Sequence, residues 1–500
     1  MGDKSPPKYP QSLSIFAKSM EKNYTKQVLA LAILVLMLLT GLSLLPAGMT
    51  LGNLELRKMD IFADVRDSSA VELSKLAASL PPPDTLEYSP LDTSSITSTD
   101  TTGAQARADS IRVISPKDSV YFGKSIEDYT FDQQGLSRFF AAVDSISRGR
   151  TVRVAWYGDS FVEGDILVGD LRDTLQTAWG GAGVGFVPIT SEVAQFKRTL
   201  KHNFRGWTAY SIIKKSESRP KLGLNGYAYR PEAEAKVHYE GTNYFKHTQH
   251  WNQVRFFYKS ESARSFVWQA GGEAPHQETL AAKSDRLGIW KWHGSAAGTN
   301  AFALRFPESE GILAYGATLE SGPGIYLDNF SVRGNSGGPL KLLDPEFMHQ
   351  FDAVQQYDLI VLQVGLNAVT NSLTNIKWYE AELDRTFKHL KNCFPGKPIL
   401  VVSVGDRGAK VGTEITTMVG VPAIVQMQRH LARKHGLLFY DLFWGMGGPN
   451  TMLRFSYQRP RLANTDYTHL THDGGKVVGG MFAKLFLQEQ AKWQLDRKSQ

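Results

Sequence analysis

The sequence predicts an α/β protein whose parallel sheet is covered by helices on both faces and is interrupted by an all-β domain. Short apolar runs that end in glycine or polar residues alternate with segments of helical spacing, which is typical of a buried parallel sheet. Residues 222–325 instead carry alternating, aromatic-rich runs separated by Gly, Ser and Asn turns, which indicate a sandwich or jelly roll. The chain of 500 residues is also too long for one compact core.

The first element is an apolar segment at residues 27–47, and no charge occurs between Lys26 and Glu55. About 20 residues at ~1.5 Å each span a hydrocarbon core of about 30 Å. The lysines before it predict a cytoplasmic tail (1–26), a single-pass signal anchor in the inner (cytoplasmic) membrane, and an extracytoplasmic, periplasmic remainder. A cleaved signal peptide is the competing interpretation, disfavoured by the long leader and a poor cleavage site at Leu45–Gly48. A buried core helix would require an amphipathic period that the segment lacks.

A tract rich in Pro, Ser, Thr and Asp follows at residues 48–120, and it has too few large apolar residues to offset the entropy of ordering. We therefore expect a disordered tether. The expected folded parts are a first α/β segment at 121–221, the β insert at 222–325 and a second α/β segment at 326–490. Residues 491–500 are expected to form a tail.

Three buried strands of the α/β unit are predicted from their apolar runs, at Val152–Tyr157, Leu359–Val364 and Pro398–Val404. Helical spacing predicts five helices around them: 136–146, 167–179, 378–391, 421–434 and 476–495. In sheets of this kind the chemistry gathers at the carboxyl ends of the strands. The residues after each strand are therefore the candidates for function.

The charge and cysteine content of the chain limit the kinds of partner and cofactor that we expect. The net charge of +7 is not concentrated in any Lys/Arg run, so a nucleic-acid partner is not expected. The mild basic charge suits an anionic wall polymer or is simply a solvated surface. Cys393 is the single cysteine, which excludes an intramolecular disulfide and a cysteine-based zinc site. The sequence shows no ligand cluster, so neither metal nor cofactor is expected.

Two motifs follow predicted strands. Gly158-Asp159-Ser160 would expose a serine hydroxyl at the sheet edge, although taken alone it is more often a helix cap. It does not match the G-x-S-x-G elbow. Asn367, after Gly365-Leu366, would point an amide toward the same edge, although a turn asparagine is the simpler interpretation.

A third motif, Asp466-Tyr467-Thr468-His469, places a carboxylate three residues before an imidazole. The carboxylate can accept from Nδ1–H and leave Nε2 as a base toward a serine. A purely structural pair is as plausible for this motif alone, and the neighbouring His472-Asp473 leaves the assignment open.

Taken together and in this order, the motifs resemble those of the SGNH (GDSL-like) hydrolases. The block GDSFVEGDILVGDLRDTLQTAWGGAGVGFVP at residues 158–188 is similar to the opening block of peptidoglycan O-acetylesterases. So is YGATLESGPGIY at residues 315–326, leading into GNSGG at 334–338. Those enzymes carry a carbohydrate-binding-module-like β domain between their first and second blocks. The resemblance covers residues 131–487 and implies a flavodoxin-like, three-layer α/β/α fold.

The resemblance also implies roles. Ser160 corresponds to the nucleophile, His469 to the base and Asp466 to the residue that orients it. The oxyanion hole would combine the N–H groups of Ser160 and Gly337, or Gly334 as the fallback, with the Asn367 amide. Ala368 departs from the acidic residue that many of these enzymes have after the asparagine.

The function predicted is removal of O-acetyl groups from an extracytoplasmic polysaccharide, with peptidoglycan first among them, through an acetyl-Ser160 intermediate. One alternative is an O-acetyltransferase that accepts acetyl from a membrane-bound O-acyltransferase. The other is an inactive glycan-binding protein whose insert presents aromatic rings, and its candidates are Trp251, Trp268, Trp290 and Trp292. Burial in a core is the commoner fate of such rings.

Overall fold

The computed structural model describes residues 50–51, 54–55, 123–308, 310–373 and 376–499. The chain divides into two units, residues 1–80 and residues 81–500. In the first unit, β1 (Thr50–Leu51) pairs antiparallel with β2 (Leu54–Glu55). The predicted tail, the predicted anchor at 27–47 and most of the predicted tether lie outside the described residues. Among the helices that the structure does describe, none is both long and apolar enough to cross a membrane.

The second unit contains a six-stranded sheet in the order β14-β4-β15-β16-β19-β3. Its strands are β3 (Glu127–Asp128), β4 (Thr151–Gly158), β14 (Gly324–Ser331), β15 (Leu359–Gln363), β16 (Ile399–Val402) and β19 (Leu438–Tyr440). All neighbours pair in parallel except β3, which runs antiparallel to β19. Numbered along the chain, the parallel strands stand in the order 2-1-3-4-5, which is the flavodoxin-like arrangement. The predicted α/β sheet is confirmed.

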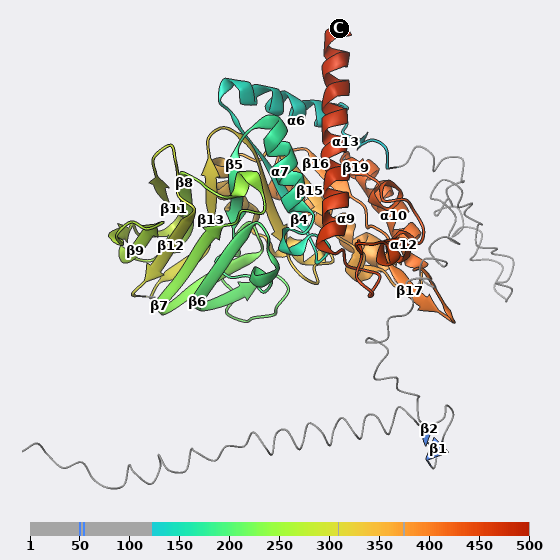
Figure 1. Cartoon of the computed structure of the whole chain (residues 1–500), viewed down its shortest axis with the longest axis horizontal. Coiled ribbons are helices and arrows are strands. Elements are labelled where there is room, and N and C mark those ends of the chain that lie inside the picture. The colour runs from blue at the N-terminus through green and yellow to red at the C-terminus, as the bar shows by residue number, and fades with distance from the viewer. Residues whose placement is uncertain (1–49, 52–53, 56–122, 309, 374–375, 500) are drawn as a thin grey trace, which may run out of the picture. The chain divides into compact units, whose positions relative to one another are not determined.

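Helices cover both faces of this sheet, as Figure 1 shows. They are α6 (Gly135–Asp144), α7 (Val168–Trp179), α8 (Pro345–Gln355), α9 (Ile376–Cys393), α10 (Gly420–His435), α11 (Leu442–Gly445), α12 (Thr451–Tyr457) and α13 (His472–Ser499). Neighbouring residues of a strand point to opposite faces. On β4, Trp156 packs edge-on against Phe482 of α13, whereas Tyr157 packs against Phe394, just after α9. Apolar side chains on both faces of β4 therefore account for helix layers on both sides of the sheet.

The inserted domain is a nine-stranded antiparallel sheet that bends back on itself. Its strands are β5 (Ala182–Val187), β6 (Leu200–Ser211), β7 (Tyr227–Gly241), β8 (Gln253–Ser260), β9 (Arg264–Ala270), β10 (His276–Leu280), β11 (Lys283–His293), β12 (Ala301–Phe306) and β13 (Ile312–Ser321). Two groups of strands meet through a single pair, Ala314 with Tyr229, and enclose a second apolar core. β6 pairs along its length with β7. The strands of this sheet therefore begin with β5 at residue 182 and β6 at residue 200, both before residue 222, where the insert was predicted to start.

The two domains share strands and a buried ion network. β5 follows α7 of the α/β unit but pairs with β13 of the insert, and the chain passes from β13 directly into β14 of the parallel sheet. Arg153 of β4 makes two hydrogen bonds of 2.6 Å to the carboxylate of Glu320 on β13. Arg255 of β8 bonds the same carboxylate. These shared strands and contacts connect the insert to the sheet beside the candidate site. Outside this unit's two main sheets, β17 (Gly408–Val411) and β18 (Glu414–Thr417) form a hairpin.

Candidate active site

Ser160 lies at the carboxyl end of β4, in a tight turn that the local sequence requires. A Cβ at Gly158 would lie 2.1 Å from the Val162 side chain, so glycine lets Val162 pack against the backbone at the end of the strand. The Phe161 N–H donates to Asp159 Oδ1 at 2.9 Å and closes the turn. The serine hydroxyl is thereby left partly exposed at the edge of the sheet.

The structure brings the three predicted triad residues together. Ser160 Oγ lies 2.9 Å from His469 Nε2, and His469 Nδ1 lies 2.7 Å from Asp466 Oδ2. Desolvation tends to raise the pKa of Asp466, but hydrogen bonds from the His469 ring and from two backbone N–H groups outweigh it and lower the pKa. The carboxylate is therefore held ionised, with Nε2 turned toward the serine, which is the geometry needed to take its proton.

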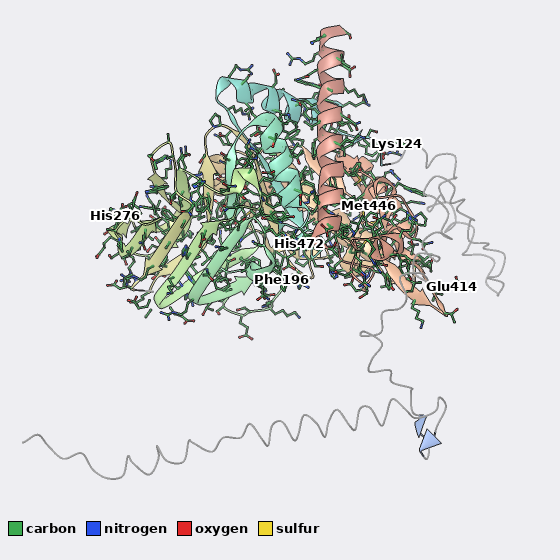
Figure 2. All side chains as sticks on the ribbon, in the orientation of Figure 1. Lys124, Phe196, His276, Glu414, Met446 and His472 are labelled. Carbon is green, nitrogen blue, oxygen red and sulfur yellow. The ribbon has the colours of Figure 1, made fainter. Side chains whose placement is uncertain are left out.

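The loop that carries His469 is fixed by backbone contacts at both ends. Ala463 and Leu470 form an antiparallel bridge, and the His469 carbonyl accepts from the Asn464 N–H at 2.8 Å. The neighbouring His472 begins α13 and bonds the Phe196 carbonyl, and Figure 2 shows the two side by side. His472 therefore faces the connection into the insert, and the assignment left open by the sequence falls to His469.

Asn367 lies beside the serine, as predicted, directly after β15. Its Nδ2 donates to Asn335 O at 3.2 Å and to Asp159 Oδ2 at 3.4 Å. Both bonds are long, so an oxyanion at this position can replace one of them. The Ser160 N–H makes no hydrogen bond to another described residue. Both groups can serve as oxyanion donors.

Gly337 does not match its predicted role in this conformation. Its backbone has φ +98°, which glycine adopts readily, and a Cβ would approach Leu383 and Val364 within 3 Å. Its N–H, however, donates to the side-chain Oδ1 of Asn335 at 2.9 Å and is not free for an oxyanion. The fallback, Gly334, lies exposed in the turn closed by the Asn335 N–H and the Val332 carbonyl.

The sequence analysis did not predict a positioning role for two residues of the site, Asp159 and Asn335. Both side chains are almost fully buried next to the site. Burial raises the pKa of Asp159 to about 6, while the Phe161 N–H and the nearby His469 act in the opposite direction. Its carboxylate holds the Asn367 amide. Their positions in the motifs GDS and GNSGG, next to the predicted site residues, could have indicated this role.

Comparisons with known proteins agree with this geometry at the level of the fold. No family model and no curated protein matches the sequence. Among solved structures, a peptidoglycan O-acetylesterase superposes with a TM-score of 0.60 and 19% identity, covering 73% of this chain and 99% of that one. An acetyl xylan esterase (18% identity, 32% of this chain and 79% of that one) and a GDSL-like lipase from Parabacteroides merdae (15%, 33% and 73%) both match with a TM-score of 0.25, too low to support an argument.

The chain has the SGNH (GDSL-like) hydrolase fold. In this fold Ser160 and Asn367 follow neighbouring strands at their carboxyl ends, and the Asp466–His469 pair lies just before α13. The hydrogen-bonded Ser160–His469–Asp466 chain has the geometry that a serine nucleophile, its base and the orienting carboxylate require. Within the described residues, no group of three or more His, Cys, Asp or Glu side chains is placed to hold a metal ion.

The tryptophans suggested as sugar platforms mostly lie in the core of the insert. Trp251, Trp268 and Trp292 are at most 9% exposed. Trp290 is partly buried, and its indole N–H donates to Glu278, which also accepts from Trp268. Of the four candidates, only Trp290 presents appreciable surface to solvent.

Proposed function

We propose that this chain is a serine esterase that removes O-acetyl groups from an extracytoplasmic polysaccharide, with peptidoglycan as the first candidate. The observation that carries the proposal is the continuous hydrogen-bonded chain from Ser160 through His469 to Asp466. The match to a peptidoglycan O-acetylesterase over almost its whole length supports a glycan as the substrate. The predicted anchor at 27–47 supports a place at the outer side of the inner membrane, where such a polymer lies.

The reaction is acyl transfer in two steps. His469 Nε2 takes the proton of Ser160 as its Oγ attacks the acetyl carbonyl carbon, and the oxyanion is stabilised by the Asn367 amide and the Ser160 N–H. The bond to the sugar oxygen then breaks, and His469 gives the proton to the leaving alcohol. Water next attacks the acetyl-enzyme with His469 again as base, which releases acetate and restores the serine.

Acetate release by the full-length protein tests this proposal. The substrates are p-nitrophenyl acetate and O-acetylated peptidoglycan, each with the wild-type chain and with Ser160→Ala. We expect release from both substrates by the wild type and loss of release in the variant. A surface serine, Ser147→Ala, serves as the matched control and should keep wild-type rates, since its side chain is exposed and bonds only a local carbonyl.

The acceptor separates esterase from transferase. A soluble glycan is added to the reaction, and free acetate and acetylated acceptor are measured together. Ser160-dependent free acetate supports the esterase, whereas acetylated acceptor in its place would indicate a transferase that uses the same triad. If no ester yields Ser160-dependent product, the enzymatic proposal is wrong.

A further inference from the structure

A small polar cavity lies between the α/β unit and the insert, next to the triad but separate from it. Its volume is about 80 Å³. Its floor includes Ser211 and Asn225, which are 3% and 5% exposed. Its rim includes Glu192 and Lys214, which form an ion pair of 2.8 Å with largely exposed side chains. The cavity therefore has a buried, polar interior and a solvent-exposed rim.

Two segments next to Ser160 contribute to the cavity wall: the turn that follows Ser160 and strand β14, which pairs with β4. Glu163 and Gly164, in the turn that follows Ser160, line it directly. Ser331, also in its wall, pairs with Gly158, two residues before the serine. The cavity wall therefore includes residues only two to four positions from Ser160 along the chain or from its strand partner.

The charges around the cavity balance. Its charged lining residues are two carboxylates and two ammonium groups: Glu163, Glu192, Lys197 and Lys214. Glu163 is paired with Arg333 at 2.6 Å. Lys197 interacts electrostatically with Asp165 and Glu163. A charged group would gain little here, so the lining favours an uncharged ligand that both donates and accepts hydrogen bonds.

The volume of the cavity and its other lining residues further restrict which chemical group can bind there. A water needs about 10–15 Å³ of such space, so the cavity holds a group of only a few heavy atoms and no whole sugar ring. Asn225 and Tyr227 supply side-chain amide and hydroxyl groups, and Pro188 and Val193 supply apolar surface. An acetamido group has this composition: one N–H, one carbonyl and one methyl.

We propose that this cavity is a recognition subsite for the N-acetyl group of an N-acetylhexosamine in the glycan chain. The inference rests on the proposed function for the position of the substrate, and it adds the residues that choose the sugar. Tyr227 and Asn225 come from the insert, whereas Glu163 and Ser331 come from the α/β unit. The insert therefore contributes to specificity by closing this subsite, and its buried tryptophans are not needed for that role.

A pair of matched substrates tests the proposal. O-acetylated chitotetraose carries N-acetyl groups at C2, and O-acetylated cellotetraose has hydroxyl groups there. We expect the wild-type chain to show a kcat/KM about tenfold or more higher for the first. Tyr227→Phe and Asn225→Asp should each reduce this preference about fivefold, the effect of one hydrogen bond. Asn225→Asp keeps the Oδ1 that accepts from the Tyr227 N–H at 3.2 Å, so the local turn is preserved.

Tyr244→Phe is the matched control, because Tyr244 is an exposed tyrosine outside the cavity lining. It should leave the preference unchanged. A binding experiment separates this inference from the proposed function. Calorimetry measures the binding of unacetylated chitotetraose and of cellotetraose to the Ser160→Ala chain, with and without Tyr227→Phe. Chitotetraose binding that weakens with Tyr227→Phe supports the subsite even if no ester is cleaved. Equal binding of the two sugars, or a preference unchanged by both cavity variants, would overturn it.

Discussion

Replacing Asp159 by asparagine is expected to make the protein more stable at alkaline pH while making it a poorer catalyst. The Asp159 side chain is almost completely buried, and desolvation raises its pKa from 3.8 to about 6. A folded-state pKa above the unfolded value means that the native state binds the extra proton between these pH values. The free energy of unfolding therefore falls as pH rises from about 4 to about 6.

The magnitude follows from the size of the pKa shift. A difference of about two units corresponds to about 3 kcal/mol at pH 8, where the carboxylate is charged in both states. At pH 4.5 the same linkage amounts to about 1 kcal/mol. Asparagine has no such charge but cannot accept from both the Phe161 N–H and the Asn367 amide, which costs about 1 kcal/mol. Asp159→Asn should thus gain about 2 kcal/mol at pH 8 and little at pH 4.5.

Urea unfolding of the wild type and the variant at both pH values measures this difference, because all other titrating groups cancel in the comparison. Asp285→Asn, at an exposed position of the insert, is the control and should show no pH-dependent gain. In parallel, kcat for p-nitrophenyl acetate should fall about tenfold or more in Asp159→Asn, since the Asn367 amide loses its carboxylate partner. A stability difference that is the same at pH 8 and pH 4.5 would refute the reasoning.

The remaining predictions concern the oxyanion donor, the orienting carboxylate and the domain junction. Asn367→Ala should lower kcat for p-nitrophenyl acetate about 100- to 1,000-fold, whereas the free energy of unfolding should fall by no more than about 1 kcal/mol, because the side chain is exposed and loses only its long bonds to Asp159 and Asn335. Asp466→Asn should lower kcat about 100-fold, less than for a buried triad carboxylate, because its side chain is 48% exposed and water can replace part of its effect. An unchanged rate would show that Asp466 does not orient His469. Glu320→Gln should lower the free energy of unfolding by about 3–5 kcal/mol in urea, since it leaves the buried Arg153 without its partner; a loss below about 1 kcal/mol would contradict the role of this pair.

The parallel sheet was predictable where burial alone determines the sequence. β16 is a continuous apolar run, β15 is one up to Gln363, and β4 is apolar except for Thr151 and Arg153; each strand was predicted within two residues of its bounds. β14 escaped prediction because it carries Asp328 and Asn329 in its middle. Asp328 is fully buried and accepts from the Phe186 N–H and the Tyr357 hydroxyl. A strand with buried polar residues lacks the apolar pattern that predicts a strand, because the hydrogen-bond partners of those residues are distant in the sequence.

The triad and two of the oxyanion donors were predictable from motif order, but the state of the Gly337 N–H was not. Ser160, Asn367 and the Asp466–His469 pair each follow or precede a regular element that fixes where they point. The Gly337 N–H depends on a competing acceptor two residues away, and whether the Asn335 side chain turns toward it is a question of local packing. The start of the insert before residue 222 was not predicted for a related reason. β6 is an edge strand with many exposed side chains and a glycine, Gly206, in its middle.

The fusion of the two domains has a consequence for substrate choice. Glu320 sits on β13, which belongs to the insert, yet it is held by Arg153 of β4, the strand that ends at the nucleophile. β13 then continues through a short connection into β14, which pairs with β4 along its whole length. β7, which carries Tyr227 of the cavity lining, pairs with β13 at Ala314, so β13 connects this part of the insert to the strands next to Ser160. Under the proposed subsite, selection between glycans rests on which substituent fits the cavity when the acetyl group is at the serine.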